Sequence, residues 1–434
     1  MYILKNDYFT KFLSAAFLLL FFFMPINNPV FGESLSGHSI YTSRIHDSAA
    51  VYLTPDQFNV TPDALGDDSE SLQQAIDFIE ERSDFGIVFI PEGEYHFNRT
   101  VYVWKGIRLI GYGENRPRFV LEQNTPGYDA EESVYMLHFA SDKPCKGRPI
   151  RDANPGTFYS AVSNIDFVIH DGNPAAVAVR SHFAQHCFIA HTDFYIGNGK
   201  VGVEKVGNEI ENCRFIGGQY GIITTKPSPS WPFLMIDTVF KGQKKAAIST
   251  EEGGLTLVRN QFINVPHAVV VNADRAEELF MTDCRFDNIS KAAVVISDEF
   301  NARPQFNFKQ IVCRNTPFLV RFRKSGKRIK APADLYLVKD FCHGMQIEDI
   351  GAEGKVLTSV NMEPISAFPE PVETDIPRLP DTRDWVNLRS LGAAGDGETD
   401  DTQVIQQAVR DHQVIYIPTG RYRVSETIQL LPNT

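Results

Sequence analysis

The sequence predicts an all-β protein built as a parallel β-helix, a solenoid in which the short strands of successive coils stack on one another. Three observations support this prediction. A short phrase ending in Phe recurs between residues 160 and 320 at intervals of 21–27 residues, a period typical of one solenoid coil. Phe is unusually common, with 32 Phe against 3 Trp. An amphipathic helix precedes the repeats, where it would close the open end of a solenoid.

The repeated phrase predicts two inward-facing rows of side chains. Its copies NIDF, HTDF, NCRF, DTVF, RNQF and DCRF end at Phe167, Phe194, Phe215, Phe240, Phe262 and Phe286. Turn residues and a second short apolar run, such as Ala246–Ile248, follow each copy. We expect the Phe rings to stack in the core. The residue two positions earlier shares the same face of the strand and should also point inward. An antiparallel sandwich has strands every 8–12 residues but would not repeat one three-part phrase at this spacing.

Residues 67–80 are expected to form the capping helix. Acidic residues stand at its start, where the helix dipole favours them, and Leu72, Ala75, Ile76 and Ile79 form one apolar stripe. A strand, a turn and a second strand follow at 86–95. The same order of elements recurs near the C-terminus, where residues 395–407 match the helix and residues 414–422 match the strands.

The N-terminus predicts export. Lys5 and Lys11 precede an apolar run from Phe12 to Ile26, which is typical of a cleaved signal peptide and shorter than the ~20 residues of a membrane-spanning helix. The alternative is an uncleaved membrane anchor. We expect a secreted or periplasmic protein with no stable membrane insertion after cleavage.

Four segments follow from these patterns. They are a signal peptide at 1–32, a first β-helix module at 50–345, a Pro-rich linker at 346–384 and the start of a second module at 385–434. Because one strand pair cannot cover its own apolar face, we expect further coils after Thr434. The alternative is a short tail that docks back onto the first solenoid.

Composition excludes some partners. Lys and Arg number 42 against 54 Asp and Glu, a net charge of -12, which argues against nucleic acid because that affinity comes from basic residues. The six Cys show no metal-binding spacing, and we expect no metal and no cofactor. Cys213 and Cys284 would lie three coils apart, too far for a disulfide. The sequence does not set the oligomeric state.

Acidic loops follow the second apolar run of several coils and provide the catalytic candidates. These are Glu251, Glu252, Asp274 and Asp298. Carboxylates one coil apart suit the ~5–5.5 Å separation of a retaining glycosidase, and carboxylates two coils apart suit an inverting enzyme. The alternative is that they are solvated surface acids of an acidic protein.

Other side chains are candidates for lining a saccharide groove. They are Trp231, Gln219, Tyr220, His170, Asp171 and Gln185. Trp231 has the apolar face on which a sugar ring stacks, although it could equally close a loop over the core. The others could equally be turn residues whose polar groups are satisfied locally.

The C-terminal phrases GDGETDDTQVIQQAV at 395–409 and IYIPTGRYRVSETIQL at 415–430 resemble the pectate-lyase superfamily, in particular its rhamnogalacturonase/epimerase-like branch. A weaker copy stands at 66–103. Two modules in tandem are similar to family-55 exo-β-1,3-glucanases. The resemblance implies a right-handed, pectin-lyase-like β-helix. In such glucanases the general acid is a Glu of the second module, so no catalytic residue is carried over to this chain.

Taken together, these features favour an exported glycoside hydrolase of a β-glucan or pectin-like polysaccharide. One alternative is a polysaccharide lyase acting by β-elimination, whose unsaturated products absorb in the ultraviolet. The other is a non-catalytic saccharide-binding protein or adhesin, which would bind a polysaccharide without releasing a product.

Overall fold

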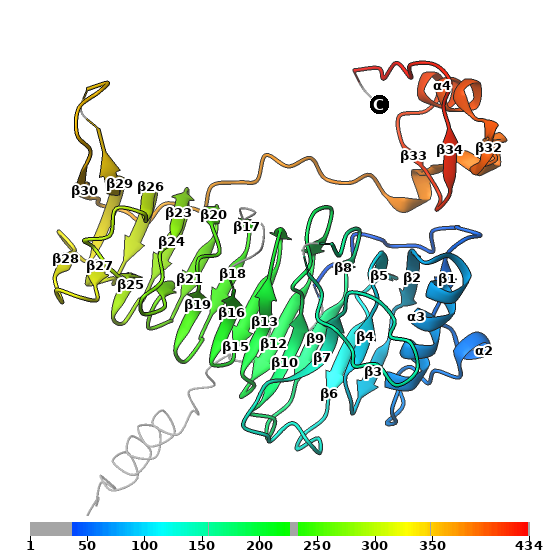
Figure 1. Ribbon diagram of the computed structural model, residues 1–434, viewed down its shortest axis with the longest axis horizontal. Coiled ribbons are helices and arrows are strands. Elements are labelled where there is room, and N and C mark those ends of the chain that lie inside the picture. Colours follow the sequence, from blue (N-terminus) through cyan, green and yellow to red (C-terminus); the bar gives the residue numbers. More distant parts are fainter. Residues whose placement is uncertain (1–36, 155, 226–232, 348, 433–434) are drawn as a thin grey trace, which may run out of the picture. The chain divides into compact units, whose positions relative to one another are not determined.

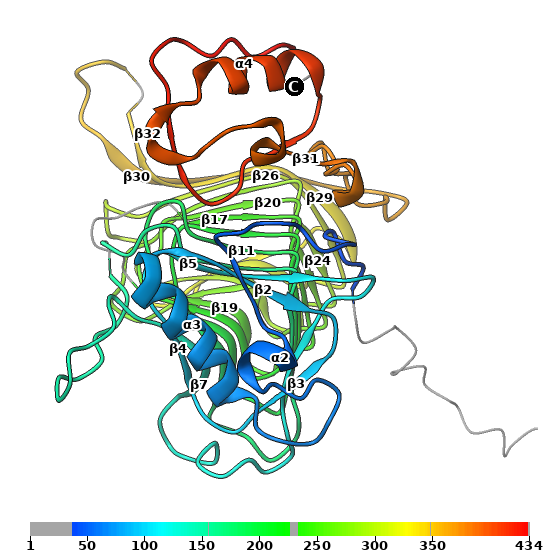
Figure 2. The same ribbon diagram turned by 90° about the vertical axis from the view of Figure 1, so that its right-hand side faces the viewer.

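The computed structural model describes residues 37–154, 156–225, 233–347 and 349–432. The described residues form a right-handed parallel β-helix, which confirms the predicted fold (Figures 1 and 2). Each regular coil contains three short strands. The first two belong to one large sheet, and the third belongs to a smaller sheet. The predicted signal peptide lies outside the described residues.

The strands of each kind stack in parallel register. The first strands of the coils are β1 (Val51–Tyr52), β2 (Gly86–Pro91), β5 (Ile107–Tyr112), β8 (Ala161–Ser163), β11 (Phe188–Ala190), β14 (Glu209–Glu211), β17 (Phe233–Ile236), β20 (Leu255–Val258) and β23 (Glu278–Thr282). The second strands are β3 (Glu94–Phe97), β6 (Arg118–Leu121), β9 (Asp166–Ile169), β12 (Asp193–Gly197), β15 (Arg214–Gly217), β18 (Val239–Lys241), β21 (Gln261–Ile263) and β24 (Arg285–Asp287). The third strands are β4 (Val101–Val103), β7 (Val134–Phe139), β10 (Ala176–Arg180), β13 (Val201–Val206), β16 (Tyr220–Thr224), β19 (Ala246–Thr250), β22 (Val269–Val271), β25 (Ala292–Ile296) and β27 (Phe318–Phe322).

The predicted row of Phe side chains runs through the core. Phe167 pairs in register with Phe194, and the row continues through Phe215, Phe240 and Phe262 to Phe286. All six side chains are fully buried. From the first to the fifth ring, neighbouring centroids lie 5.2, 4.6, 4.9 and 5.2 Å apart and the rings are nearly parallel. Each ring is therefore buried against the ring of the next coil instead of being exposed to water.

The second predicted row is also buried. Its members are Ile165, Thr192, Cys213, Thr238, Asn260 and Cys284. Both cysteines in this row are free, as predicted. Immediately before this row, the chain turns at a residue with positive φ in successive coils. These residues are Asn164, His191, Asn212, Asp237, Arg259, Asp283 and Gln310, with φ between 47° and 59°. This turn separates the first strand of each coil from the second.

The predicted capping helix is α3 (Ser69–Ser83), preceded by the single turn α2 (Pro55–Phe58). The side chains of Leu72, Ala75, Ile76 and Ile79 are buried in the core with the first coils, and Figure 2 shows α3 lying across them. Helix α3 thereby closes the apolar end of the first coils.

The far end of the regular coils changes to antiparallel pairing. β26 (Gln305–Arg314) spans the positions of a first and a second strand, and β29 (Leu335–Gln346) and β30 (Lys355–Pro364) pair with it in succession. β28 (Arg328–Lys330) pairs antiparallel with β27. β30 lies within the range predicted as linker, and residues 365–380 contain no helix or strand.

The C-terminal unit, residues 382–432, consists of short elements. They are η1 (Thr382–Asp384), β31 (Val386–Asn387), η2 (Leu388–Leu391), β32 (Asp396–Asp400), α4 (Thr402–Asp411), β33 (Ile415–Tyr416) and β34 (Arg421–Arg423). The phenol of Tyr416 and the backbone N–H of Thr419 donate to Asp47 at 2.9 and 2.7 Å. Within the described part of the chain, no helix is both long enough and apolar enough to cross a membrane.

Candidate functional site

A cavity of about 340 Å³ lies on the outer face of the large sheet, at the start of β20, β23 and β26. Strand residues form its floor, and the loops that precede the three strands form its wall. Its lining residues are Glu252, Gly253, Gly254, Leu255, Thr256, Ala276, Glu277, Glu278, Leu279, Phe280, Arg303, Gln305 and Asn307. We refer to it as the carboxylate cavity.

The floor of the carboxylate cavity combines an aromatic ring with polar side chains. Thr256, Phe280 and Asn307 are in register on adjacent strands, so their side chains point the same way. Phe280 keeps 36% of its surface exposed. Gln305 pairs in register with Glu278 beside it. An exposed ring next to amide and carboxylate groups can pack against the apolar face of a sugar while hydrogen-bonding its hydroxyls.

Two carboxylates from successive coils reach this cavity. Glu278 is exposed at the start of β23. Glu252 precedes β20, and its side chain is 15% exposed. The Glu252 carboxylate accepts a hydrogen bond from the N–H of Ala276 at 3.3 Å, and the Arg303 guanidinium lies 4.0 Å away. A pair of carboxylates is what acid–base chemistry on a glycosidic bond requires.

Glu277 supports the cavity from below. Its buried carboxylate accepts hydrogen bonds from the backbone N–H groups of Gly253 at 3.0 Å, Gly254 at 2.7 Å and Glu278 at 3.0 Å, and from the hydroxyl of Thr250. Burial raises the pKa of Glu277, although these hydrogen bonds oppose that shift. Both carboxylate oxygens of Glu277 already accept hydrogen bonds within the protein. Glu277 therefore stabilises the loop around Gly253 and Gly254 that forms part of the cavity wall.

The structure separates the four catalytic candidates. They occupy the same turn of successive coils, as stacking predicts, but among them only Glu252 lines the carboxylate cavity. Glu251 accepts from Asn272 at 3.2 Å and lies 3.7 Å from Arg275. Asp298 is held at 2.6 Å by Lys324, which lowers its pKa. Asp274 is exposed in the loop after β22.

The saccharide-binding candidates lie elsewhere. His170 and Asp171 follow β9 and Gln219 follows β15, so these three belong to the turn between the second and third strands, and Tyr220 begins the third strand β16. Gln185 is half-buried in the turn between β10 and β11. Trp231 lies outside the described residues. The structure therefore does not bring this group together with the catalytic candidates.

Sequence reasoning missed most of the cavity lining. Glu278, Phe280, Gln305 and Asn307 alternate along β23 and β26 with the buried residues of those strands. A coil-by-coil alignment that read the outward as well as the inward positions would have placed these four residues side by side.

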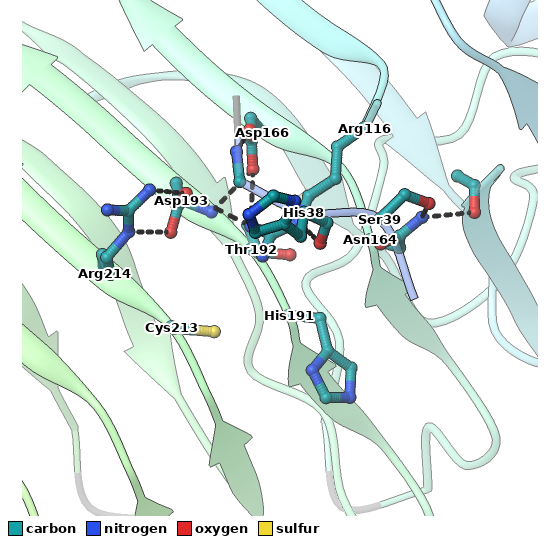
Figure 3. A network of polar contacts seen from close by, with 12 residues as sticks. His38, Ser39, Arg116, Asn164, Asp166, His191, Thr192, Asp193, Cys213 and Arg214 are labelled. Carbon is teal, nitrogen blue, oxygen red and sulfur yellow. Dashed lines mark hydrogen bonds and ion pairs between the residues drawn. The ribbon is translucent and has the colours of Figure 1, made fainter. Parts of the chain in front are cut away.

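A second polar cluster lies under the N-terminal segment Gly37–Ile40 (Figure 3). Asp166 and Asp193 stand one coil apart, each immediately before a Phe of the buried row, and one nitrogen of Arg116 lies 3.0 and 3.2 Å from their oxygens. Arg214 forms a two-point ion pair with Asp193. The N–H of Gly37 donates to Asp166 at 3.2 Å.

The two carboxylates of this second cluster do not meet solvent. Asp166 is 0% exposed and Asp193 is 1% exposed. Burial and the neighbouring charge of Asp193 raise the pKa of Asp166 to about 6. Asn164 adds two further bonds to the segment, accepting from the N–H of Ile40 at 3.0 Å and donating to Ser39 at 2.8 Å. Because a polymer cannot reach these carboxylates, we interpret the cluster as a clamp for residues 37–40.

No group of three or more His, Cys, Asp or Glu among the described residues is placed to hold a metal ion.

Comparisons with known proteins give a family-model match over more than half of the chain. The family model for rhamnogalacturonase A/epimerase, pectate lyase-like proteins matches residues 56–294 and 385–434.

The matches to individual relatives cover only a part of those proteins. The non-secreted LysM effector LysM19 of Penicillium expansum is 21% identical over 393 residues, which cover 79% of this chain and 29% of that protein. The pre-neck appendage protein of Bacillus phage B103 is 39% identical over 49 residues, or 11% of this chain and 6% of that protein. The chain thus spans less than a third of either relative. Among solved structures, the iota-carrageenase of family GH82 from A. fortis has a TM-score of 0.37 at 14% identity, covering 59% of each chain.

Proposed function

The chain belongs to the rhamnogalacturonase A/epimerase, pectate lyase-like family, and on that premise we propose that it is an exported glycoside hydrolase that cleaves a polysaccharide in the carboxylate cavity. The observation that carries this proposal is the lining of that cavity, where carboxylates from two successive coils lie beside an exposed ring and a guanidinium. The substrate class is a β-glucan or a pectin-like polymer.

The proposed roles follow from position. Glu278 is exposed to solvent on the cavity floor and is assigned as the acid that protonates the glycosidic oxygen. Glu252, with Arg303 4.0 Å away, is assigned as the carboxylate that attacks the sugar carbon or activates water. Phe280 is assigned as the platform for one sugar ring, and Asn307 and Gln305 as partners for its hydroxyls.

The test is hydrolysis of a panel of β-glucans and pectin-like polymers by the native chain and two variants. We expect new reducing ends without new ultraviolet absorbance. We expect Glu278→Gln and Glu252→Gln each to lower kcat by about 100-fold or more, because a positioned acid or base contributes ~10²–10⁴-fold. Glu251→Gln is the matched control, since Glu251 belongs to the same turn but not to the cavity lining, and it should retain activity.

Three results would count against the proposal. Ultraviolet-absorbing products would favour β-elimination by a lyase. Binding of a polymer with no product would favour the saccharide-binding or adhesin alternative. Full activity of both cavity variants would show that the reaction takes place outside this cavity.

A further inference from the structure

Three arginines from neighbouring coils lie together on the outer face of the large sheet. They are Arg259 in the turn before β21, Arg285 at the start of β24 and Arg314 at the end of β26, and we call them the arginine row. Gln261 pairs in register with Arg285, and Asp287 pairs with Arg314. Neighbouring coils are about 4.8 Å apart, and each arginine stands two residues further along its coil than the one before it, so the three form a diagonal line across the sheet.

Arg285 differs from the other two in its partners. Arg259 and Arg314 each form a two-point ion pair with an aspartate of the preceding coil, with Asp237 at 2.7 Å and with Asp287 at 2.8 Å. Among the described residues, Arg285 has no acidic partner within ion-pair distance. Its buried Nη1 also lacks a hydrogen-bond partner there. Arg285 is partly buried, and a buried donor atom without an acceptor is costly, so its Nη1 favours a ligand that supplies an acceptor.

The chain's own linker covers this row. The guanidinium carbons of Arg285 and Arg314 each lie 4.1 Å from the centre of the Phe368 ring. Asp375 lies 3.0 Å from Arg259. Burial lowers the pKa of Arg285, and the nearby negative charge of Glu370 opposes that shift. Figure 1 shows this segment, drawn in orange, running back beside the solenoid.

The covering segment is held by few contacts. Residues 365–380 form no helix or strand, and apart from Phe368 the side chains of residues 366–375 are exposed. Segments with little buried apolar surface and no backbone ladder detach at low cost in free energy. A ligand can therefore displace this segment if it offers a flat surface of the size of the Phe368 ring together with carboxylates.

We propose that the arginine row is a binding site for an acidic polysaccharide, a polyuronate, and that residues Phe368–Asp375 occupy it as an intramolecular competitor. A polyuronate carries one carboxylate per sugar, and guanidinium groups bind carboxylates in a two-point fork. The net charge of -12 repels a polyanion over most of the surface. Arg285, which forms no ion pair among the described residues, is therefore the main attachment point once residues Phe368–Asp375 move away. The ligand class rests on the proposed function, but the binding itself does not require turnover.

The first test measures affinity for polygalacturonate by titration calorimetry at low salt. Phe368→Ala combined with Glu370→Gln should bind at least tenfold more tightly than the native chain, and added salt should weaken that binding. Adding Arg285→Gln to this variant should abolish the gain. Phe78→Ala and Arg151→Gln are matched controls at an exposed Phe and an exposed Arg outside the row, and neither should change the affinity. Binding of a neutral β-glucan should be the same in all variants.

The second test needs no substitution. Trypsin can cut after Arg378, immediately beyond the covering segment. Polygalacturonate should accelerate cleavage at this site in the native chain, whereas a neutral β-glucan should not. An unchanged cleavage rate, an affinity gain that survives Arg285→Gln, or the absence of any gain in the linker variant would each overturn the inference.

The two proposals can fail separately. Glu278→Gln removes the acid assigned to the carboxylate cavity but leaves the arginine row intact. If this variant loses activity and still binds polygalacturonate through Arg285, both proposals stand. If activity survives in Glu278→Gln while binding depends on Arg285, only the proposed function fails.

Discussion

A Phe ring in the buried row contacts the ring of the coil before it and the ring of the coil after it. Phe215 illustrates this arrangement, with Phe194 at 4.6 Å and Phe240 at 4.9 Å between ring centroids. The backbone packs closely against the ring as well. A Cβ added at Gly202 would lie 2.6 Å from Phe215, so the glycine at that position makes room for the ring. Each position of the row is therefore specified in both size and shape.

Replacing Phe215 with Ala should lower the free energy of unfolding by about 3–5 kcal/mol, the usual cost of removing a buried Phe side chain. The matched control is Phe300→Ala, because Phe300 is 71% exposed, and it should change stability by less than about 0.5 kcal/mol. Denaturant unfolding followed by circular dichroism measures both. Equal effects of the two substitutions would contradict the buried row.

The stability of the clamp at residues 37–40 should depend on pH through Asp166. Its pKa of about 6 is above the ~3.9 of an unfolded chain, so the folded state holds this proton more tightly. That contribution is complete below about pH 4 and is lost as the pH rises through about 6. The gap in Tm between the native chain and Asp166→Asn should therefore shrink between pH 4 and pH 7. A gap that widens over this range would contradict the assignment.

Asp152 should show the opposite dependence. Burial alone would raise its pKa, but hydrogen bonds from His138, His182 and Arg180 overcome burial and hold the pKa far below its usual value. Its contribution to stability is present at neutral pH and is lost as the pH falls below about 4. The gap in Tm between the native chain and Asp152→Asn should be largest near pH 7 and should shrink in acid, measured on the same samples and buffers as for Asp166.

At the scale of elements, periodic features were predictable and irregular ones were not. The Phe row, the small residues beside it and the stripe of α3 recur at fixed spacing, and each was found from the sequence because burial constrains every copy. The carboxylate cavity depends on outward residues, which burial does not constrain, and on loops of different length in each coil. Glu252 belongs to an acidic loop that recurs in successive coils, so it was predicted. Phe280 and Asn307 are outward-facing strand residues, and they were missed.

The capping element is specified by an aspartate that occurs in both copies. Asp68, at the start of α3, accepts from the N–H groups of Thr61 at 2.9 Å and His96 at 3.0 Å. Asp401, at the start of α4, accepts from Ala394 at 2.7 Å and Gly395 at 3.0 Å. Both aspartates are buried. Each ties the start of its helix to a neighbouring segment, which explains why an acidic residue stands there in both copies.

Replacing Asp68 with Ala should leave two backbone N–H groups without their acceptor and lower the free energy of unfolding by about 1–3 kcal/mol or more. Asp56→Ala is the control, because Asp56 is exposed on α2 and the substitution should have little effect. Thermal unfolding of the three proteins measures the difference. An Asp68→Ala variant as stable as the Asp56→Ala control would show that the carboxylate does not fix the cap.

At the scale of the whole molecule, the solenoid and the C-terminal unit at 382–432 differ greatly in the size of their buried apolar clusters. One continuous cluster of buried side chains runs from Val51 to Phe341. In the described part of the C-terminal unit, the buried apolar cluster is small and is formed by Leu388, Ala393 and Ala408. Since burial of apolar surface is the main source of stability, the C-terminal unit depends more heavily on its contacts with residues 41–47. These contacts include the edge-to-face packing of Trp385 on Tyr41 and the hydrogen bonds to Asp47.

We therefore expect two separable unfolding transitions, with the C-terminal unit unfolding first. Asp401→Ala should lower the Tm of the first transition and leave the second unchanged, because Asp401 fixes the cap of the small unit. Asp47→Ala should lower the first transition more than the second, because Asp47 anchors that unit at Tyr416 and Thr419 and also accepts a hydrogen bond from Ala49 within the solenoid. Asp68→Ala should lower the second. Differential scanning calorimetry resolves the two transitions, and proteolysis during heating identifies which unit has opened. A single transition that all three substitutions shift equally would mean that the small unit and the solenoid unfold as one cooperative body, and the contacts at Asp47 would then couple them far more strongly than their small buried area implies.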